Sequence, residues 1–169
     1  MSKIYSGLPY RSLFNPHLQL DFLTTAGPRL VGLYFSGRPQ NLLVELPDLV
    51  EKTPFGDFRF LGGHRLWHAP EALPRTYIPD NEGAMVGEVP NGIRIEMLAE
   101  AWTHIAKSIG ITLNPDRPQI TVRHELRNEG VWPLEFSAWG ITILRLGGVA
   151  IFPQPGEMWM RPDYSPIVN

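Results

Sequence analysis

Apolar and polar residues alternate along much of the chain with the period of two that is typical of half-buried β-strands. The clearest run is residues 120–127, where Ile120, Val122, His124 and Leu126 share one face and charged or polar residues occupy the other. Similar alternation covers residues 18–22, 30–35, 93–98 and 105–113. Each of these runs is predicted to be a β-strand.

Two later segments and one ambiguous segment complete the pattern. Residues 134–146 predict a long, mostly buried strand, and residues 149–152 a short one. Residues 96–107 contain good helix formers and are compatible with a short helix. Alternation from Thr103 to Leu113 favours a strand in the same place.

Proline and turn residues restrict helices throughout the chain. The 17 prolines in 169 residues are roughly twice the usual share of ~5%, and proline breaks a helix interior. Turn-forming residues at 26–28, 36–39, 90–92, 114–116 and 128–130 separate the predicted strands. Many short strands with such turns predict an all-β fold, an antiparallel β-sandwich.

Composition narrows the class of protein. Length predicts one domain over residues 1–169, and 43% hydrophobic with 19% charged residues excludes general disorder. The net charge of -2 gives no basic surface, so nucleic acid is not an expected partner. No apolar run is long enough for a membrane helix. The amino terminus has no signal-like apolar stretch and cysteine is absent, which favours a cytoplasmic location.

The end of the sequence is predicted to be an irregular tail, residues 154–169. Its prolines and glycine interrupt any regular pattern. The alternative is that further strands follow and that this sequence stops before them. The pattern carries no information on the oligomeric state.

One segment combines glycine, histidine, arginine and aromatic residues at unusual density. Residues 62–81, which we name the polar-aromatic segment, contain Gly62, Gly63, His64, Arg65, Trp67, His68, Glu71, Arg75, Tyr77, Asp80 and Asn81. Core segments rarely look like this, because a buried polar group without a partner costs about 1–3 kcal/mol. Aromatic faces beside charged side chains are typical of a site for a polyhydroxylated ligand such as a sugar.

The segment predicts roles for its residues. The expected ligand-binding residues are Arg65, Trp67, His68, Arg75, Tyr77, Asp80 and Asn81, with Trp67 or Tyr77 as the stacking face. If catalysis follows binding, we expect His64 as the general acid and Glu71 as the base, since histidine titrates near neutral pH.

A metal site is the first alternative, and it is not expected. His64 and His68 would lie ~6 Å apart along a helix and could share an ion. In a strand the same spacing is ~13 Å, too far for one ion. The preceding glycines and the following Pro70 disfavour a helix, so neither a metal nor another cofactor is predicted.

A structural role is the second alternative. His64 could bond to a neighbouring carbonyl, Trp67 could belong to the core, and Arg65 or Arg75 could pair with Glu71 or Asp80. The protein would then be a non-enzymatic sandwich, with the segment as an ion-pair network or a docking surface. His124 is expected to be a core histidine, unless its strand lines a cleft and faces the same site as His64. His17 and His104 are expected at the surface.

The polar-aromatic segment, with residues 27–43 and 124–135, resembles an uncharacterised bacterial domain family of the galactose mutarotase-like superfamily. The match spans about residues 18–153. The resemblance implies a β-sandwich whose concave sheet holds a sugar. It also implies an aldose 1-epimerase-like reaction, in which a carboxylate removes the anomeric hydroxyl proton and a histidine protonates the ring oxygen.

The sequence departs from the epimerases at two places. Their catalytic histidine usually lies where this chain has residues 136–142, which contain no histidine. Their catalytic glutamate lies on a late strand, beyond Asn169 in this numbering. The resemblance therefore predicts carbohydrate binding, while it assigns no catalytic residue by position.

Overall fold

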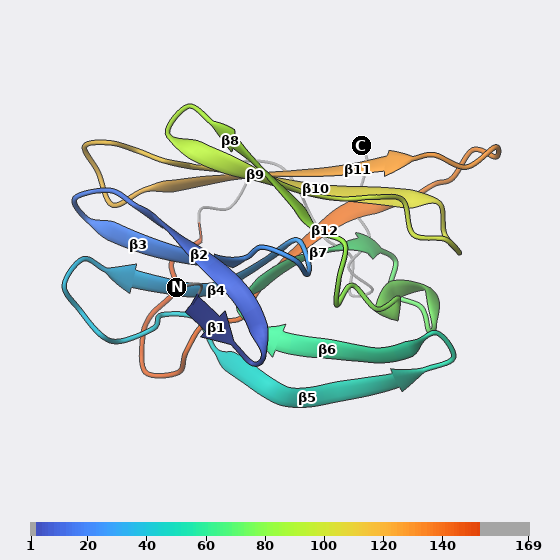
Figure 1. The fold of residues 1–169 in the computed structure, drawn as a ribbon, viewed down its shortest axis with the longest axis horizontal. Helices are drawn as coiled ribbons and strands as arrows, with labels where there is room; N and C mark the ends of the chain where they lie inside the picture. Colours follow the sequence, from blue (N-terminus) through green and yellow to red (C-terminus); the bar gives the residue numbers. More distant parts are fainter. Residues whose placement is uncertain (1–2, 153–169) are drawn as a thin grey trace.

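The computed structural model describes residues 3–152, which form antiparallel strands and one 3-10 helix, η1 (Arg75–Tyr77) (Figure 1). The strands are β1 (Lys3–Tyr5), β2 (Leu8–Phe14), β3 (Leu18–Leu23), β4 (Arg29–Phe35), β5 (Glu45–Thr53), β6 (Gly56–Gly62), β7 (His64–Ala69), β8 (Met85–Val89), β9 (Gly92–Met97), β10 (Ile105–Leu113), β11 (Ile120–Asn128) and β12 (Ser137–Thr142). Within this part of the chain no helix is long and apolar enough to cross a membrane.

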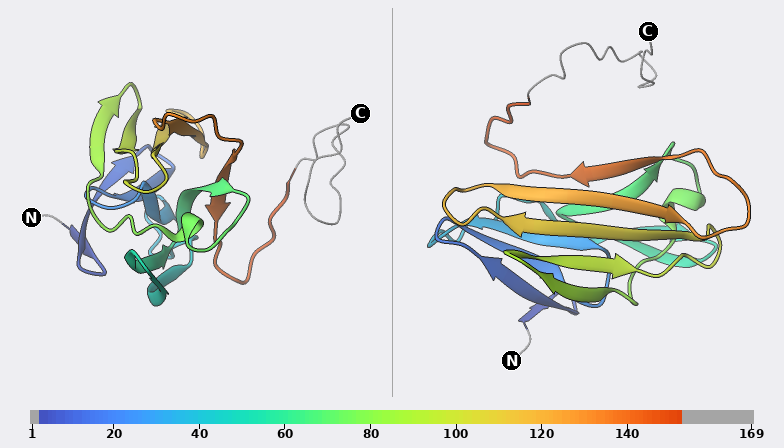
Figure 2. Two further views of the ribbon diagram at one scale, coloured as in Figure 1. Left: turned by 90° about the vertical axis from the view of Figure 1, so that its right-hand side faces the viewer. Right: turned by 90° about the horizontal axis from the view of Figure 1, so that it is seen from above.

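The strands form three sheets. A six-stranded sheet has the order β1-β2-β3-β4-β7-β12, a four-stranded sheet the order β11-β10-β9-β8, and β5 and β6 form a separate hairpin. Figure 1 shows the four-stranded sheet on one side of the six-stranded sheet and the hairpin on the other side. Seen from above, β10 and β11 lie over the strands of the larger sheet (Figure 2). This architecture confirms the predicted all-β antiparallel sandwich.

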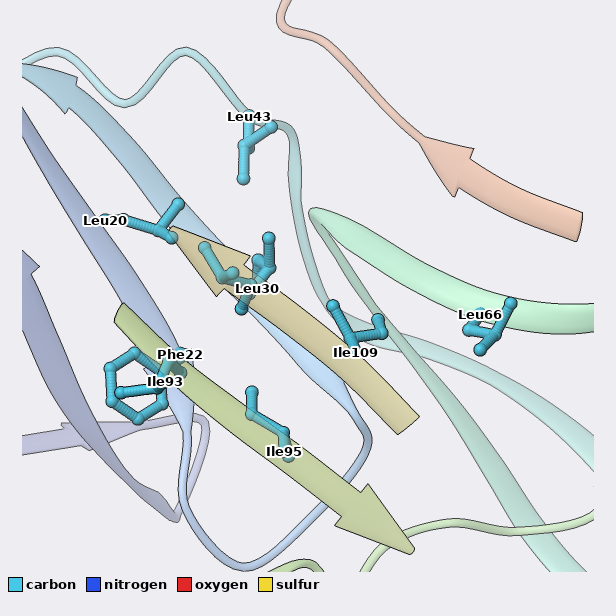
Figure 3. Packing of buried hydrophobic residues seen from close by; sticks show 9 residues of the cluster. Leu20, Phe22, Leu30, Leu43, Leu66, Ile93, Ile95 and Ile109 are labelled. Carbon is cyan, nitrogen blue, oxygen red and sulfur yellow. The ribbon is translucent and has the colours of Figure 1, made fainter. Parts of the chain in front are cut away.

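Apolar side chains from the facing surfaces of the two larger sheets, with Leu43 from the β4–β5 connection, fill the space between the sheets (Figure 3). The cluster consists of Leu20, Phe22, Leu30, Leu43, Leu66, Ile93, Ile95, Ile109 and Ile111. Alternate residues of each strand point inward, so β9 and β10 each contribute two isoleucines at a spacing of two. Burial of this apolar surface is the main force that holds the sheets together.

Five predicted strands are confirmed, and they correspond to β3, β4, β9, β10 and β11. The helix alternative for residues 96–107 is wrong, because residues 98–104 form the connection between β9 and β10. The predicted turns all fall between strands or at their ends. Strands β1, β2, β5, β6, β7 and β8 were not predicted. Proline interrupts the pattern in β2 and β5, and polar residues or short length obscure it in the other four.

The prediction of a long, buried strand over residues 134–146 is wrong. The strand β12 covers only Ser137–Thr142, at the edge of its sheet. Beyond Thr142 the backbone leaves β7: the amide of Ile143 bonds to the carbonyl of Gly63, and its carbonyl accepts from Val44, each at 2.9 Å. Residues 149–152 form no strand, so that prediction is also wrong. The expected tail, residues 154–169, lies outside the described residues.

The core predicts a contrast between a buried and an exposed aliphatic side chain. Ile109 is fully buried, so Ile109→Ala should lower the free energy of unfolding by about 2–5 kcal/mol through lost contacts and a cavity. Leu98 is 72% exposed, and Leu98→Ala should change it by less than about 0.5 kcal/mol. Urea unfolding of both variants measures the difference; equal losses would contradict this packing.

Candidate functional site

Residues His64–Ala69 of the polar-aromatic segment form strand β7, and their side chains lie on both faces of that strand. Successive side chains of a strand point to opposite faces. Leu66 packs in the core between the sheets, and His64 contacts His124 of β11 on that inner side. Arg65 and Trp67 lie on the outer side, against aromatic residues of β6. The predicted residues therefore do not surround one hollow.

Two glycines turn the chain from β6 into β7. Gly62 and Gly63 have φ values of +80° and +69°, which favour glycine. A Cβ atom at Gly63 would lie 1.8 Å from the carbonyl oxygen of Leu30, and one at Gly62 would lie 2.1 Å from that of Val44. Only glycine lets the backbones approach this closely, so the pair fixes where β7 begins.

On the outer side of β7, Asp80 forms a buried ion pair with Arg29. Arg29 has no exposed surface, and its Nη2 donates to Asp80 Oδ1 at 2.7 Å while Nε donates to Oδ2 at 3.3 Å. Its Nη1 donates to the carbonyl of Phe60 at 2.6 Å. The structural alternative expected Arg65 or Arg75 as the partner of Asp80, and the observed partner is Arg29. The two-pronged geometry joins β4 to the segment after η1.

Arg65 and Trp67 are packed inside an aromatic cluster. The guanidinium of Arg65 lies 5.0 Å from the ring of Phe60 and 4.7 Å from that of Trp67. Trp67 also contacts Tyr77 and Trp139, with ring centroids 4.9 and 5.6 Å away. Burial lowers the pKa of Arg65 to about 10, and Arg29 adds to this effect. Both side chains are buried, so the Trp67 ring stacks on protein groups.

Three further predicted residues lie near this cluster and bond within the protein. The hydroxyl of Tyr77 donates to Glu71 Oε1, and Asn81 Nδ2 donates to the carbonyl of Asp57 at 2.8 Å. Burial raises the pKa of Tyr77 to about 12, and the Glu71 carboxylate adds to this. Glu71 is exposed, and its partner Tyr77 packs on the outer side of β7, opposite to His64. The expected acid and base are therefore not brought together.

On the inner side, His64 contacts His124. Their Nε2 atoms are 2.8 Å apart, and His64 Nδ1 lies 2.7 Å from Thr142 Oγ1 on β12. Burial lowers the pKa of His64 to about 4, and His124 and Arg65 add to this. Burial also lowers the pKa of His124. His124 thus faces His64, and the two rings contact each other directly. His17 and His104 are exposed, as expected.

Also on the inner side, His68, Glu100 and Lys107 form what we call the buried polar chain. Lys107 Nζ pairs with Glu100 Oε1, and His68 Nε2 lies 4.0 Å from Glu100 Oε2. The side chains of His68, Glu100 and Lys107 are 0%, 10% and 4% exposed. Burial lowers the pKa of His68 to about 4, with Lys107 and then Arg75 contributing. Neither ring nitrogen of His68 bonds to another described residue.

A cavity of about 220 Å3, which we name the Arg75–Trp102 cavity, lies next to this chain. Its lining is Arg75, Trp102, Thr103, Ile105, Leu134, Glu135 and Phe136. Two of its walls contact the buried polar chain: Thr103 Oγ1 donates to Glu100, and the ring of Phe136 lies edge-on 6.5 Å from that of His68. Of the predicted site residues, Arg75 alone belongs to this lining.

Metal binding has no support from the geometry. His64 and His68 are separated by the strand spacing, and His64 pairs with His124 instead. Among residues 3–152 no three His, Cys, Asp or Glu side chains are grouped as metal ligands.

Several residues around the cavity escaped prediction. Glu100, Trp102, Glu135 and Phe136 lie in connections where no pattern singles them out. Lys107 did carry a signal, because it occupies an inward position between Ile105 and Ile109. A lysine in an apolar face requires a buried anion, and Glu100 is that anion.

The Arg29–Asp80 pair predicts a large loss of stability on removal of its acid. Asp80→Ala leaves a fully buried guanidinium unpaired and should lower the free energy of unfolding by about 3–5 kcal/mol. The matched control is Glu88→Ala, which removes the exposed pair with Arg11 and should cost less than about 1 kcal/mol. Similar small losses in urea unfolding of both variants would refute a structural role for Asp80.

Comparison of the chain with protein-family models, with curated proteins and with solved structures gives no match. The resemblance to the galactose mutarotase-like superfamily stays a prediction.

Proposed function

We propose that the protein binds a small carbohydrate in the Arg75–Trp102 cavity. The observation that carries this proposal is one cavity that combines an indole face, a guanidinium, a hydroxyl and a carboxylate. A sugar ring offers apolar C–H groups to an aromatic face and hydroxyl groups to charged donors and acceptors. Trp102 is 51% exposed, so its ring has free surface for such a contact.

The size and lining of the cavity support a small ligand. Its volume of about 220 Å3 lies below the ~300–1,000 Å3 of sites for drug-sized molecules, which favours a ligand of about one sugar ring. Its apolar walls are Trp102, Ile105, Leu134 and Phe136. A mainly apolar lining with a few polar groups is typical of ligand sites. Phe55 packs against Trp102 with centroids 5.1 Å apart and supports the indole from outside the cavity.

The geometry supports binding better than epimerase chemistry by the expected pair. His64 is neutral near pH 7 because its pKa lies near 4, and Thr142 and His124 occupy its nitrogens. Glu71 bonds to Tyr77 on the other side of β7. A general acid and base must both reach the reacting groups, so we propose no catalytic role for these two residues.

A second candidate function is protein binding at the same end of the sandwich. Val131 and Trp132 are 88% and 77% exposed, and Pro133 alone separates them from the cavity residues Leu134 and Glu135. Contiguous exposed apolar residues often mark protein interaction sites. A peptide or protein would then contact Trp132 as well as Trp102, whereas a sugar in the cavity would contact Trp102.

The test is a calorimetric titration of the protein with monosaccharides, which measures the binding affinity. Trp102→Ala should weaken binding by about two- to tenfold, since an aromatic contact contributes ~0.5–1.5 kcal/mol. Arg75→Gln removes a charged donor and should weaken binding by about tenfold or more. Trp132→Ala, which alters an exposed indole outside the cavity, is the control and should bind as the unaltered protein does. Absence of binding to any monosaccharide, or full binding by Trp102→Ala, would refute the proposal.

A further inference from the structure

Two imidazoles meet where the edges of the two large sheets face each other. His64 belongs to β7 and His124 to β11, and their Nε2 atoms are 2.8 Å apart. The ring centroids are only 5.0 Å apart, so the two nitrogens point almost directly at each other. This is the geometry of one N–H···N hydrogen bond, in which one imidazole donates and the other accepts.

Strand β12 is shaped to hold this pair. Gly140 lies under His124: a Cβ atom there would be 2.8 Å from Cε1 and Nε2 of that ring. Two positions later, Thr142 lies 2.7 Å from His64 Nδ1 and fixes the orientation of the ring. β11 and β12 are edge strands of different sheets, and no backbone ladder joins them. The histidine pair is therefore a side-chain link across this edge.

We propose that the His64–His124 pair is a proton-operated latch, which holds the β11–β12 edge closed when its hydrogen bond is made and releases it when both imidazoles are protonated. A doubly protonated pair has two N–H groups facing each other and no acceptor. It also places two positive charges at hydrogen-bond distance, where they repel.

No neighbouring carboxylate among the described residues is placed to stabilise a second positive charge on the histidine pair. The residue paired with His64 on β4 is Leu30, and the residue paired with His124 on β10 is Ile109. Arg65 is the charged residue that acts on His64 besides His124, and it opposes protonation. Arg123 and Glu125 flank His124, but Glu125 pairs with Arg94 at 3.2 Å. Among residues 3–152, no carboxylate forms a salt bridge with either ring.

The direction of the pH effect follows from burial. Both histidines have a pKa below the ordinary value of 6.5, and that of His64 is about 4. Between about pH 4 and pH 6.5, these two histidines therefore bind more protons in the unfolded chain than in the folded chain. The contribution of the latch is complete above about pH 6.5 and declines as the pH falls towards 4.

A bound metal would need a different geometry. Two nitrogens at ~2.0–2.1 Å from a tetrahedral ion lie roughly 3.3 Å apart, which is longer than the 2.8 Å observed. A shared proton fits the observed distance.

The experiment is amide hydrogen exchange of the intact chain at about pH 7.5 and about pH 5, expressed as protection factors. Protection of the β12 amides, Ser137–Thr142, should fall about tenfold or more at the lower pH, while that of β9 is retained. Equal protection of β12 at both pH values would overturn the proposal.

Two variants separate the latch from other titrating groups. In His124→Gln, a side chain that can donate and accept at every pH replaces the imidazole. β12 protection should lose the part of its pH dependence that comes from His124 and from its charge on His64, while the part that comes from burial of His64 remains. His17→Gln is the control, because His17 is exposed and bonds to the Asp116 carbonyl at 3.0 Å; it should behave as the unaltered protein. His68 titrates in all three proteins and cancels in the comparison. An unchanged pH dependence in His124→Gln would overturn the proposal.

Two measurements on the unaltered chain complete the test. Ring nitrogen-15 spectra should show one protonated and one unprotonated Nε2 across the pair at neutral pH, even if His124→Gln does not fold. Addition of Zn2+ at neutral pH should leave the melting temperature unchanged. Two Nε2 atoms of the same protonation state, or a rise with Zn2+ that His124→Gln abolishes, would overturn a proton latch.

Discussion

Strand β7 is covered on both faces, so the polar side chains that it carries are shielded from water and depend on groups inside the protein. The four-stranded sheet covers one face, and the aromatic residues of β6 and η1 cover the other. An unpaired charge in such a place would cost several kcal/mol, on the order of the stability of a whole domain. His64 bonds to His124, and Arg65 donates to the carbonyl of Phe60. His68 has no hydrogen-bond partner among the described residues and lies 4.0 Å from the Glu100 carboxylate.

The polar groups on the two faces of β7 have different surroundings. On the outer face, Arg29 and Asp80 neutralise each other and Arg65 lies between aromatic rings, so these groups are committed to the fold. On the inner face, the buried polar chain contacts the Arg75–Trp102 cavity, since the cavity residue Thr103 donates a hydrogen bond to Glu100. The ion pair of Glu100 with Lys107 thereby fixes the connection that carries Trp102.

Much of the fold could be predicted from the sequence, and less of the site. Alternation located β11 and β10 because each has one apolar, inward face. It did not reveal β7, since both faces of that strand are buried and its inward and outward residues are equally polar. The density of the polar-aromatic segment was visible, but nearness along the chain does not indicate which side chains meet. His64 contacts His124, 60 residues away, and Arg75 lines the same cavity as Glu135.

The proposed ligand would contact the Arg75–Trp102 cavity and leave the contacts of the polar groups on β7 unchanged. The most direct measurement is a monosaccharide titration followed through the tryptophan indole N–H signals in an NMR spectrum. Trp102 lines the cavity and Trp67 is buried among Phe58, Tyr77 and Trp139. The Trp102 signal should shift with ligand concentration while the Trp67 signal stays in place. A shift of Trp67 with no change at Trp102 would contradict this division.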